Sequence, residues 1–265
     1  MNPMAAKWTI TRLTTLLLLP TALSVVGVAD AQEFQYSGDD GPAHWSGLNP
    51  EWEACAGPEG SARQSPINIR KVSFDKSLTR LDLLLYPATI DIFNNGHTIE
   101  QHYDGTGSSI YFEGTQYELQ QFHFHTLSEH TIGGDHGVME LHAVFSSGNT
   151  NLVLGMLFEI GSHANSFIEK LIGAGLPERN GDTTETDDPI NLADALTNTR
   201  SYYTYEGSLT TPPCSETVTW VVLTRPARLS RAQFESFRRI LGNNFRPLQA
   251  LNGRVVRATK PSQGH

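Results

Sequence analysis

Apolar and polar residues alternate along most of this chain, in short runs that are typical of β-strands. Side chains on a strand point alternately to its two faces, so each run offers one face to a core and the other to solvent or a site. The pattern covers residues 81–95, 97–103, 109–125, 138–147, 151–161 and 217–227. Clusters of Gly, Asn and Asp separate the runs, as turns between strands require, and Asn252-Gly253 predicts a further tight turn.

Two segments have the longer apolar period of an amphipathic helix. They are residues 163–175 and residues 229–242, and the second begins with a Ser230 cap and stops at Gly242. Residues 178–189 are acidic and poor in apolar side chains, which predicts an exposed loop. No repeat or linker divides the chain. We therefore expect a mainly β (α+β) fold in a single domain.

The first 31 residues have the features of an export signal. Lys7 and Arg12 give a positive start, residues 13–28 are mostly apolar, and residues 29–31 (Ala-Asp-Ala) fit the small-x-small cleavage pattern. A membrane anchor is the alternative, but the apolar run is short and is interrupted by Thr, Ser and Pro. We expect cleavage after residue 31, a domain of residues 32–265 that is periplasmic or secreted, and no membrane association after cleavage.

Charge and cysteine usage narrow the class of protein further. The formal net charge at pH 7 is −9 and no basic run offsets it, so the composition argues against nucleic acid as a partner. Cys55 and Cys214 are the two cysteines. In an exported chain they predict one disulfide, with two free buried thiols as the alternative.

The stretch QFHFHTLSEH, residues 121–130, adds candidate chemistry to the strand pattern. On a strand, Gln121, His123 and His125 share one face while the two phenylalanines share the other. Histidines two residues apart on a strand lie roughly 6–7 Å apart along the backbone, close enough to converge on one ion. They can also be half-buried histidines bonded to neighbours, because a metal site needs three or four ligands. A third ligand decides between these interpretations.

The run VMELHAVFSS, residues 138–147, offers that ligand. Glu140 and His142 share one face, and His142 completes a three-histidine set if this strand pairs beside residues 121–125. Three neutral imidazoles leave one tetrahedral position open, which is typical of catalytic rather than structural zinc. Gln121 and Glu140 can accept the remaining ring N–H groups of the ligands. The sequence therefore predicts one catalytic Zn²⁺ per chain.

Several ordered motifs resemble those of the α-class carbonic anhydrases. They are QFHFH, SEH, ELH and GSLTTPPC, with GPAHW, RQSPINI and NNGH upstream and NFRPLQ and LNGR downstream. The resemblance runs from about residue 34 to residue 257, and the short link between His125 and Glu129 is closest to the bacterial exported (periplasmic) branch. It implies a large, twisted, mostly antiparallel central sheet with peripheral helices and a metal site at the base of a conical cleft. It also implies reversible hydration of CO₂ to bicarbonate and a proton by zinc-bound hydroxide.

The resemblance also implies roles for single residues. Thr210 matches the residue that accepts a hydrogen bond from the hydroxide and donates its own proton to a buried carboxylate, Glu129, which orients the hydroxide. Thr211 would line the substrate site. The zinc ligands would be His123, His125 and His142 with Gln121 and Glu140 behind them, and the apolar wall for CO₂ would be Val144, Val153, Leu209 and Trp220.

Proton release involves a further set of residues. His97 matches the histidine that relays the proton to buffer, and Tyr36 would lie on the water network that leads outward. Glu100 replaces a neutral polar residue of the family, and its charge would raise the pKa of His97 if it faced the cleft. His130 could ligate by proximity, but we prefer a structural hydrogen-bonding role because the ligand set is already full.

Plainer interpretations exist for several of these residues and for the protein. Val153 and Trp220 could be core residues, residues 210–213 a rigid turn, and Glu129 an exposed carboxylate. A catalytically silent, carbonic-anhydrase-like zinc-binding module usually lacks a metal histidine, and a zinc buffer would need an exposed His-rich tract. The expected partner is a small molecule, CO₂ or bicarbonate. A homodimer is compatible with the sequence, although no residue specifies one.

Overall fold

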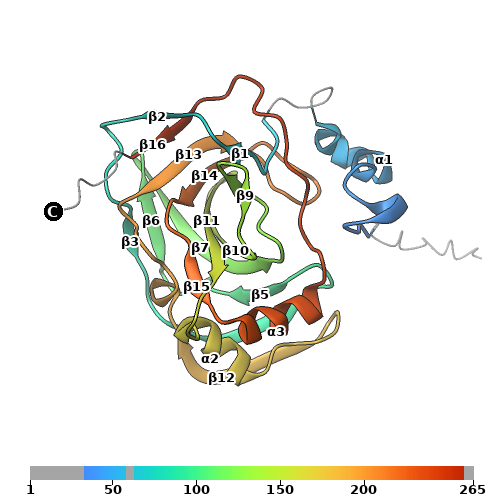
Figure 1. The fold of residues 1–265 in the computed structure, drawn as a ribbon, viewed down its shortest axis with the longest axis vertical. Helices are drawn as coiled ribbons and strands as arrows, with labels where there is room; N and C mark the ends of the chain where they lie inside the picture. The colour runs from blue at the N-terminus through green and yellow to red at the C-terminus, as the bar shows by residue number, and fades with distance from the viewer. Residues whose placement is uncertain (1–32, 58–62, 260–265) are drawn as a thin grey trace, which may run out of the picture. The chain divides into compact units, whose positions relative to one another are not determined.

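The structure is a computed structural model that describes residues 33–57 and 63–259 (Figure 1). The predicted export signal, residues 1–31, lies outside the described residues, so its cleavage stays a prediction. Within the described ranges, no helix is long and apolar enough to cross a membrane.

A 13-stranded sheet dominates the described part of the chain. Ten strands form its main path, in the spatial order β12 (Thr183–Ile190), β4 (Ala88–Asn94), β5 (Ile99–His102), β7 (Thr115–His125), β10 (Met139–Ser147), β11 (Thr150–Ile160), β14 (Val218–Leu223), β13 (Tyr202–Gly207), β16 (Val256–Ala258) and β2 (Val72–Phe74). The strands β3 (Asp82–Leu84), β6 (Ser109–Phe112) and β15 (Ala227–Leu229) attach beside this path, and a small second sheet holds β1 (Asn68–Ile69), β8 (Thr131–Ile132) and β9 (Asp135–His136). Most pairs are antiparallel, with β11–β14, β11–β15 and β16–β2 as the parallel ones in the large sheet, so the predicted fold class is confirmed.

Helices are few and short in residues 33–57 and 63–259. They are α1 (Trp45–Leu48), α2 (Ser166–Ala174) and α3 (Arg231–Leu241), with the 3₁₀ turns η1 (Gly38–Asp40), η2 (Pro50–Ala56) and η3 (Leu192–Asp194). Both amphipathic predictions are confirmed as α2 and α3. The Ser230 hydroxyl caps α3 by accepting a hydrogen bond from Gln233 N, and Gln233 Oε1 accepts one from Ser230 N, which completes a capping box.

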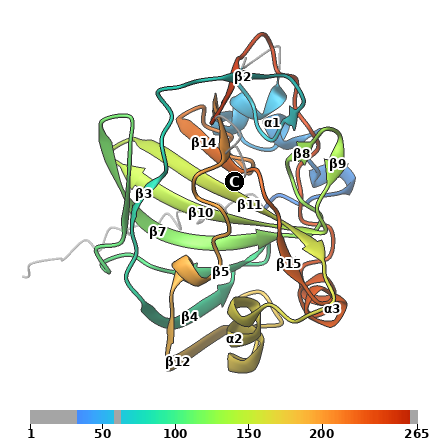
Figure 2. The same cartoon turned by 60° about the vertical axis from the view of Figure 1, so that its left-hand side comes forward.

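The central strands bury one face against the two longer helices (Figure 2). On β7, Phe122 packs against Phe167 of α2 and Phe124 against Phe237 of α3, with ring centroids 5.4 Å and 4.8 Å apart. Phe122 and Phe124 are fully buried, and each contributes about 1.5–3 kcal/mol by the usual scale for burying a large apolar side chain. Period-two alternation then forces the intervening histidines onto the opposite face of the sheet. The core therefore determines which face carries the site.

One predicted loop is a strand in the structure, and some of the predicted strands are divided in two. Residues 178–189 were expected to form a loop, but Thr183–Ile190 form the edge strand β12, which pairs antiparallel with β4 through a register shift between Thr186 and Pro189. Most of its side chains are exposed and many are acidic, a composition that suits a sheet edge because charge discourages pairing with another chain. The predicted strand 109–125 is divided at Glu113 and Gly114, which both have positive φ and form the β6–β7 turn.

Four more predicted features can be compared with the structure: two strands, a turn and the disulfide. Residues 81–95 divide into β3 and β4, and residues 217–227 reach β15 only after a break. Asn252 and Gly253 lie in a turn, as predicted, and both have positive φ. The predicted disulfide joins Cys55 to Cys214 across 159 positions, with the two Cα atoms 5.2 Å apart.

Candidate active site

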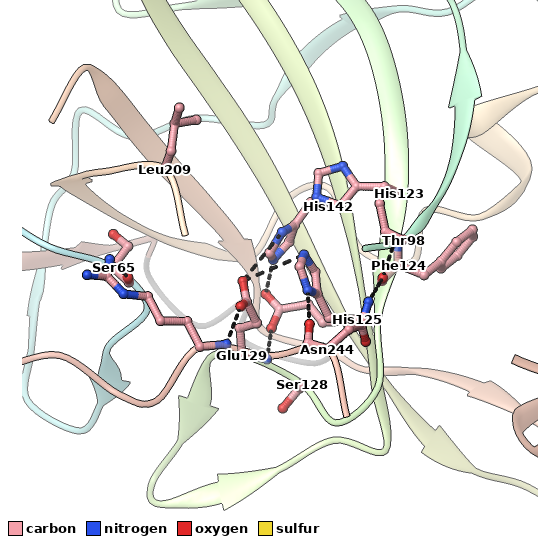
Figure 3. A network of polar contacts seen from close by, with 12 residues as sticks. Ser65, Thr98, His123, Phe124, His125, Ser128, Glu129, His142, Leu209 and Asn244 are labelled. Atoms are coloured by element: carbon pink, nitrogen blue, oxygen red, sulfur yellow. Dashed lines mark hydrogen bonds and ion pairs between the residues drawn. The ribbon is translucent and has the colours of Figure 1, made fainter. Parts of the chain in front are cut away.

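The three predicted metal ligands lie together on the face of the sheet opposite the phenylalanines (Figure 3). β7 and β10 pair antiparallel with His142 directly opposite His123, while His125 faces Glu140. The imidazole centroids are 5.1 Å apart for His123 and His125, 5.3 Å for His123 and His142, and 4.6 Å for His125 and His142. One ligand nitrogen from each histidine lies within 4.8 Å of the others, so a single metal ion can be reached by all three.

Each histidine has a protein partner on its other ring nitrogen. His123 Nδ1 lies 2.7 Å from Gln121 Oε1, and His125 Nδ1 lies 2.6 Å from the backbone oxygen of Asn244. His142 Nε2 lies 3.1 Å from Glu140 Oε1, within ion-pair distance but without hydrogen-bond geometry. This leaves His123 Nε2, His125 Nε2 and His142 Nδ1 for a metal, which is the outer-partner arrangement that orients metal-ligating imidazoles.

One of these nitrogens gives a direct test of whether the residues fit a metal. His125 is 1 % exposed, and its Nε2 has no hydrogen-bond partner among the described residues. A buried polar atom without a partner usually costs about 1–3 kcal/mol, and coordination would remove that cost. Burial and the neighbouring imidazoles lower the pKa of His123 well below its ordinary value. Burial also lowers the pKa of His125, against the charge of Glu129, so both favour the neutral form that binds metal.

Glu140 connects the ring of His142 with residues 129–130, which follow β7. Its Oε2 accepts hydrogen bonds from the backbone N–H groups of Glu129 and His130, and its Oε1 lies 2.8 Å from His130 Nδ1. Burial alone would raise the pKa of Glu140, but His130 and His142 outweigh that effect and hold it well below its ordinary value. Since His130 Nε2 lies 2.7 Å from the Tyr205 hydroxyl, both nitrogens of His130 have protein partners, which favours its structural role over ligation.

The structure buries Glu129 completely, so its interpretation as an exposed loop carboxylate is wrong. Glu129 Oε1 accepts a hydrogen bond of 2.7 Å from the backbone N–H of Arg246. Its Oε2 has no hydrogen-bond partner in the described ranges and lies 3.7 Å from His125 Nε2 and 3.9 Å from His142 Nδ1. Thr210 is also buried, but no hydrogen bond links its hydroxyl to Glu129 in the described structure. The Thr210–Glu129 pair therefore stays a prediction.

The predicted apolar wall is a row across three neighbouring strands. Val144 of β10 pairs with Val153 of β11, which pairs with Trp220 of β14. Val153 and Trp220 are buried in one apolar cluster, with Val144 and Leu209 packed against it. The Trp220 ring lies 4.8 Å from the His142 ring, so the row begins beside the proposed metal ligands. Thr211 is partly exposed, and its carbonyl accepts a hydrogen bond from the N–H of Cys214, which places it next to the disulfide.

His97 lies in the turn after β4. Its ring is half-buried and stacks on Phe34, with centroids 3.8 Å apart and planes 8° apart, and Tyr36 lies 6.4 Å away. Burial lowers the pKa of His97, while the charge of Glu33 opposes that change. Burial, together with the charge of Glu129, raises the pKa of Tyr36 well above its ordinary value.

Burial lowers the pKa of His97, and the charge that opposes this change is that of Glu33, so an effect of Glu100 on His97 stays a prediction. Glu100 does face the catalytic side of the sheet, because it pairs with His123 on the neighbouring strand. Its carboxylate approaches His102 Nε2 at 3.5 Å, so the charge acts there. His97 precedes this strand, which begins at Ile99, so alternation of side chains along the strand does not relate His97 to Glu100.

Asn244 is a functional residue that the sequence analysis missed. It is 2 % exposed, and its backbone oxygen is the partner of His125 Nδ1. Its side-chain amide donates to the backbone oxygens of His97 and Phe124, both at 2.9 Å, and its Oδ1 accepts from Thr126 N at 2.7 Å. One residue thus connects a metal ligand with the turn that carries His97. It stands in the motif NFRPLQ, but 119 positions from His125, so spacing alone could not reveal this role.

Comparisons with known proteins identify the family to which this chain is similar. The family model for eukaryotic-type carbonic anhydrase matches residues 40–260. A carbonic anhydrase from Klebsiella pneumoniae is 40% identical over 239 residues, covering 89% of this chain and 95% of its own length. One from Neisseria gonorrhoeae is 37% identical, covering 94% of this chain and 97% of its own. The solved α-carbonic anhydrase from Thermovibrio ammonificans, in complex with the inhibitor sulfanilamide, is 38% identical with a TM-score of 0.79. The match covers 85% of this chain and 99% of the solved one.

Fold, site and comparisons together define an enzyme of the carbonic anhydrase family. More specifically, the chain belongs to the eukaryotic-type, or α-class, branch of that family. Membership implies CO₂ and bicarbonate as the substrate pair.

Proposed function

We propose that this enzyme hydrates CO₂ reversibly with one zinc ion held by His123, His125 and His142. The observation that carries the proposal is the shared orientation of the three imidazole rings. One nitrogen of each ring lies next to a protein partner, and the other nitrogen is left for the metal. When bound, Zn²⁺ supplies a hydroxide nucleophile near neutral pH by lowering the pKa of water, an effect for which carbonic anhydrases are themselves the standard example.

The apolar row supplies the binding surface for an uncharged substrate. Val144 and Leu209 are partly exposed and offer aliphatic surface, while the buried Val153 and Trp220 pack behind them, with the Trp220 ring beside that of His142. CO₂ has no net charge, so contact with apolar side chains favours its transfer out of water. Bicarbonate is an anion and gains nothing from the same surface, which favours its release.

Thr210 and Glu129 are proposed to orient the nucleophile. Glu129 Oε2 is a buried acceptor without a hydrogen-bond partner among the described residues, and it lies near two metal-ligand nitrogens. If the Thr210 hydroxyl donates its proton to this carboxylate, its oxygen can act only as an acceptor toward the site. That fixes the direction of the donated hydrogen bond and is catalysis by orientation.

His97 is proposed to carry the released proton to buffer. An imidazole is the side chain suited to proton exchange near neutral pH, and because burial lowers the pKa of the half-buried His97, its neutral form is available to accept a proton. Tyr36 lies 6.4 Å from this ring and is proposed to shape the adjoining water network. The Cys55–Cys214 disulfide supports an oxidising compartment, so we propose that the enzyme acts outside the cytoplasm after removal of residues 1–31.

Stopped-flow hydration of CO₂ with a pH indicator tests the proposal. We expect fast hydration that tracks zinc content and is lost on chelation, and we expect His142→Ala to lose zinc and activity together. His97→Ala is expected to slow turnover mainly in weak buffer, with rescue by small imidazoles. One tightly bound zinc with hydration no faster than buffer would favour the alternative, a catalytically silent zinc-binding module.

A further inference from the structure

A second titratable cluster lies on the catalytic face of the sheet, outside the machinery described above. His102 Nδ1 lies 3.2 Å from Asp91 Oδ2, and His102 Nε2 lies 3.5 Å from Glu100 Oε1. The side chains are 42% exposed for His102, 39% for Asp91 and 22% for Glu100. The imidazole is therefore held between two carboxylates while it remains open to solvent.

Strand register shows that this cluster is continuous with the metal site. On β5, Glu100 pairs with His123 and His102 pairs with Gln121, whose side chain contacts the ring of His123. Paired residues of antiparallel strands point to the same side of a sheet. Ile99 and Gln101 alternate with them and are fully buried on the other face. His102 is thus one strand away from the proposed ligands.

The same row continues outward to the sheet edge. On β4, Phe93 pairs with Glu100, so Asp91 occupies the position across from His102. Asp91 in turn pairs with Glu185 of β12, which is the edge strand and is exposed at that position. Carboxylates and one imidazole therefore lead from Gln121 across β5 and β4 to solvent.

The geometry argues against a second metal site here. The two carboxylates lie next to opposite nitrogens of one imidazole, whereas the donor atoms that bind a metal have to converge on a single point. The groups of described residues that could hold a metal lie around His142 and do not include this cluster. What the cluster can do is accept and release a proton, since either ring nitrogen has an acceptor beside it.

We propose that Asp91, His102 and Glu100 form a second proton-exchange site, which passes protons from the catalytic face to buffer in parallel with His97. The proposal rests on the proposed function, because each hydration of CO₂ releases one proton that has to leave. The His102 imidazole takes up one proton from solvent on the catalytic face, and the imidazolium gives it to a buffer base; no other bond changes. One face of the His97 ring is stacked on Phe34, whereas the His102 ring lies between two carboxylates with 42% of its side chain exposed, so the two sites suit different buffers.

Proton transfer can be measured apart from CO₂ conversion by following hydration at low and high buffer concentration and by ¹⁸O exchange at equilibrium. The zinc-loaded variants are His102→Gln, His97→Ala and the double variant. His163→Gln is the matched control, because His163 is an exposed histidine just before α2, away from this row.

In weak buffer we expect His102→Gln to lower kcat by roughly 2- to 10-fold, a small part of the ~10²–10⁴ that a positioned acid–base group contributes. The effect should be larger in the His97→Ala background and should be relieved by small imidazole buffers, while His163→Gln matches wild type. kcat/KM should change less than kcat, because it does not include proton release.

Two results would overturn the proposal. One is a double variant whose rate in weak buffer equals that of His97→Ala alone. The other is an equal loss of kcat and kcat/KM in His102→Gln, which would indicate disturbance of the metal site instead. Zinc-loaded wild-type protein that fails to hydrate CO₂ would overturn the proposed function itself, and this role with it.

Discussion

Replacing Asn244 by alanine tests how the fold holds the site in place. The backbone oxygen that contacts His125 Nδ1 survives the substitution, and only the side-chain amide is lost. That amide makes three hydrogen bonds with the backbone of His97, Phe124 and Thr126, and its Oδ1 also accepts a long one of 3.4 Å from Thr126 Oγ1. The change therefore separates the metal-facing contact of Asn244 from its contacts with the turn and the loop.

The loss of stability can be estimated bond by bond. Thr126 is fully buried and its N–H loses its acceptor, which costs about 1–3 kcal/mol. The oxygen of Phe124 keeps a second hydrogen bond of 2.7 Å from Thr98 Oγ1, and the half-buried His97 can turn its oxygen to water. Those two losses add about 0.5–1 kcal/mol together, so we expect a total of about 1.5–4 kcal/mol.

Urea unfolding of the metal-free proteins measures this difference, because bound metal would add a stabilisation that depends on its affinity for each protein. Asn198→Ala is the control, since its partly exposed side chain accepts one hydrogen bond from Arg200 N and should cost less than about 1 kcal/mol. Zinc content should be kept, while kcat in weak buffer falls because His97 loses its anchor. A loss below about 1 kcal/mol for Asn244→Ala would refute the reasoning.

Three further predictions concern the disulfide, a helix cap and pH. Replacing both Cys55 and Cys214 by serine should lower the free energy of unfolding by about 5 kcal/mol, as the chain-entropy model gives for a loop of this length. An unchanged urea midpoint would contradict this prediction. Ser230→Ala should cost about 1 kcal/mol in thermal unfolding through the lost α3 cap, and no change in Tm would argue against the capping box. Burial lowers the pKa of His97, so folding disfavours its protonation, and this residue destabilises the fold as pH falls below 6.5. NMR titration should find a midpoint below 6.5 that rises in Phe34→Ala, and an unchanged midpoint would contradict the role of the stack.

Much of the sheet was predictable because its strands have one apolar face. In β7 and β10 the alternation of phenylalanine or leucine with histidine is visible in the sequence, and it places three histidines on one face once the two strands pair. The same reasoning failed for β12, whose backbone pairs with β4 while its side chains stay polar and exposed. An edge strand contributes little to the core, so hydrophobic pattern cannot distinguish it from a loop.

The supports of the site were less predictable than its ligands. Gln121 and Glu140 were found because they lie two residues before a histidine on the same strand. Asn244 and the contact of His102 with Asp91 depend on tertiary placement, since they join segments from different parts of the sheet and from the chain after α3. Local periodicity carries no information about such contacts, because they depend on which segments the fold brings side by side.

Zinc titration into metal-free enzyme tests the central claim most directly, with CO₂ hydration and bound zinc measured on the same samples. The three-histidine site predicts that rate and occupancy rise together and stop at one zinc per chain, and that His142→Ala stays inactive at every zinc concentration. Hydration without zinc, or full occupancy without hydration, would contradict the claim that His123, His125 and His142 hold the catalytic metal.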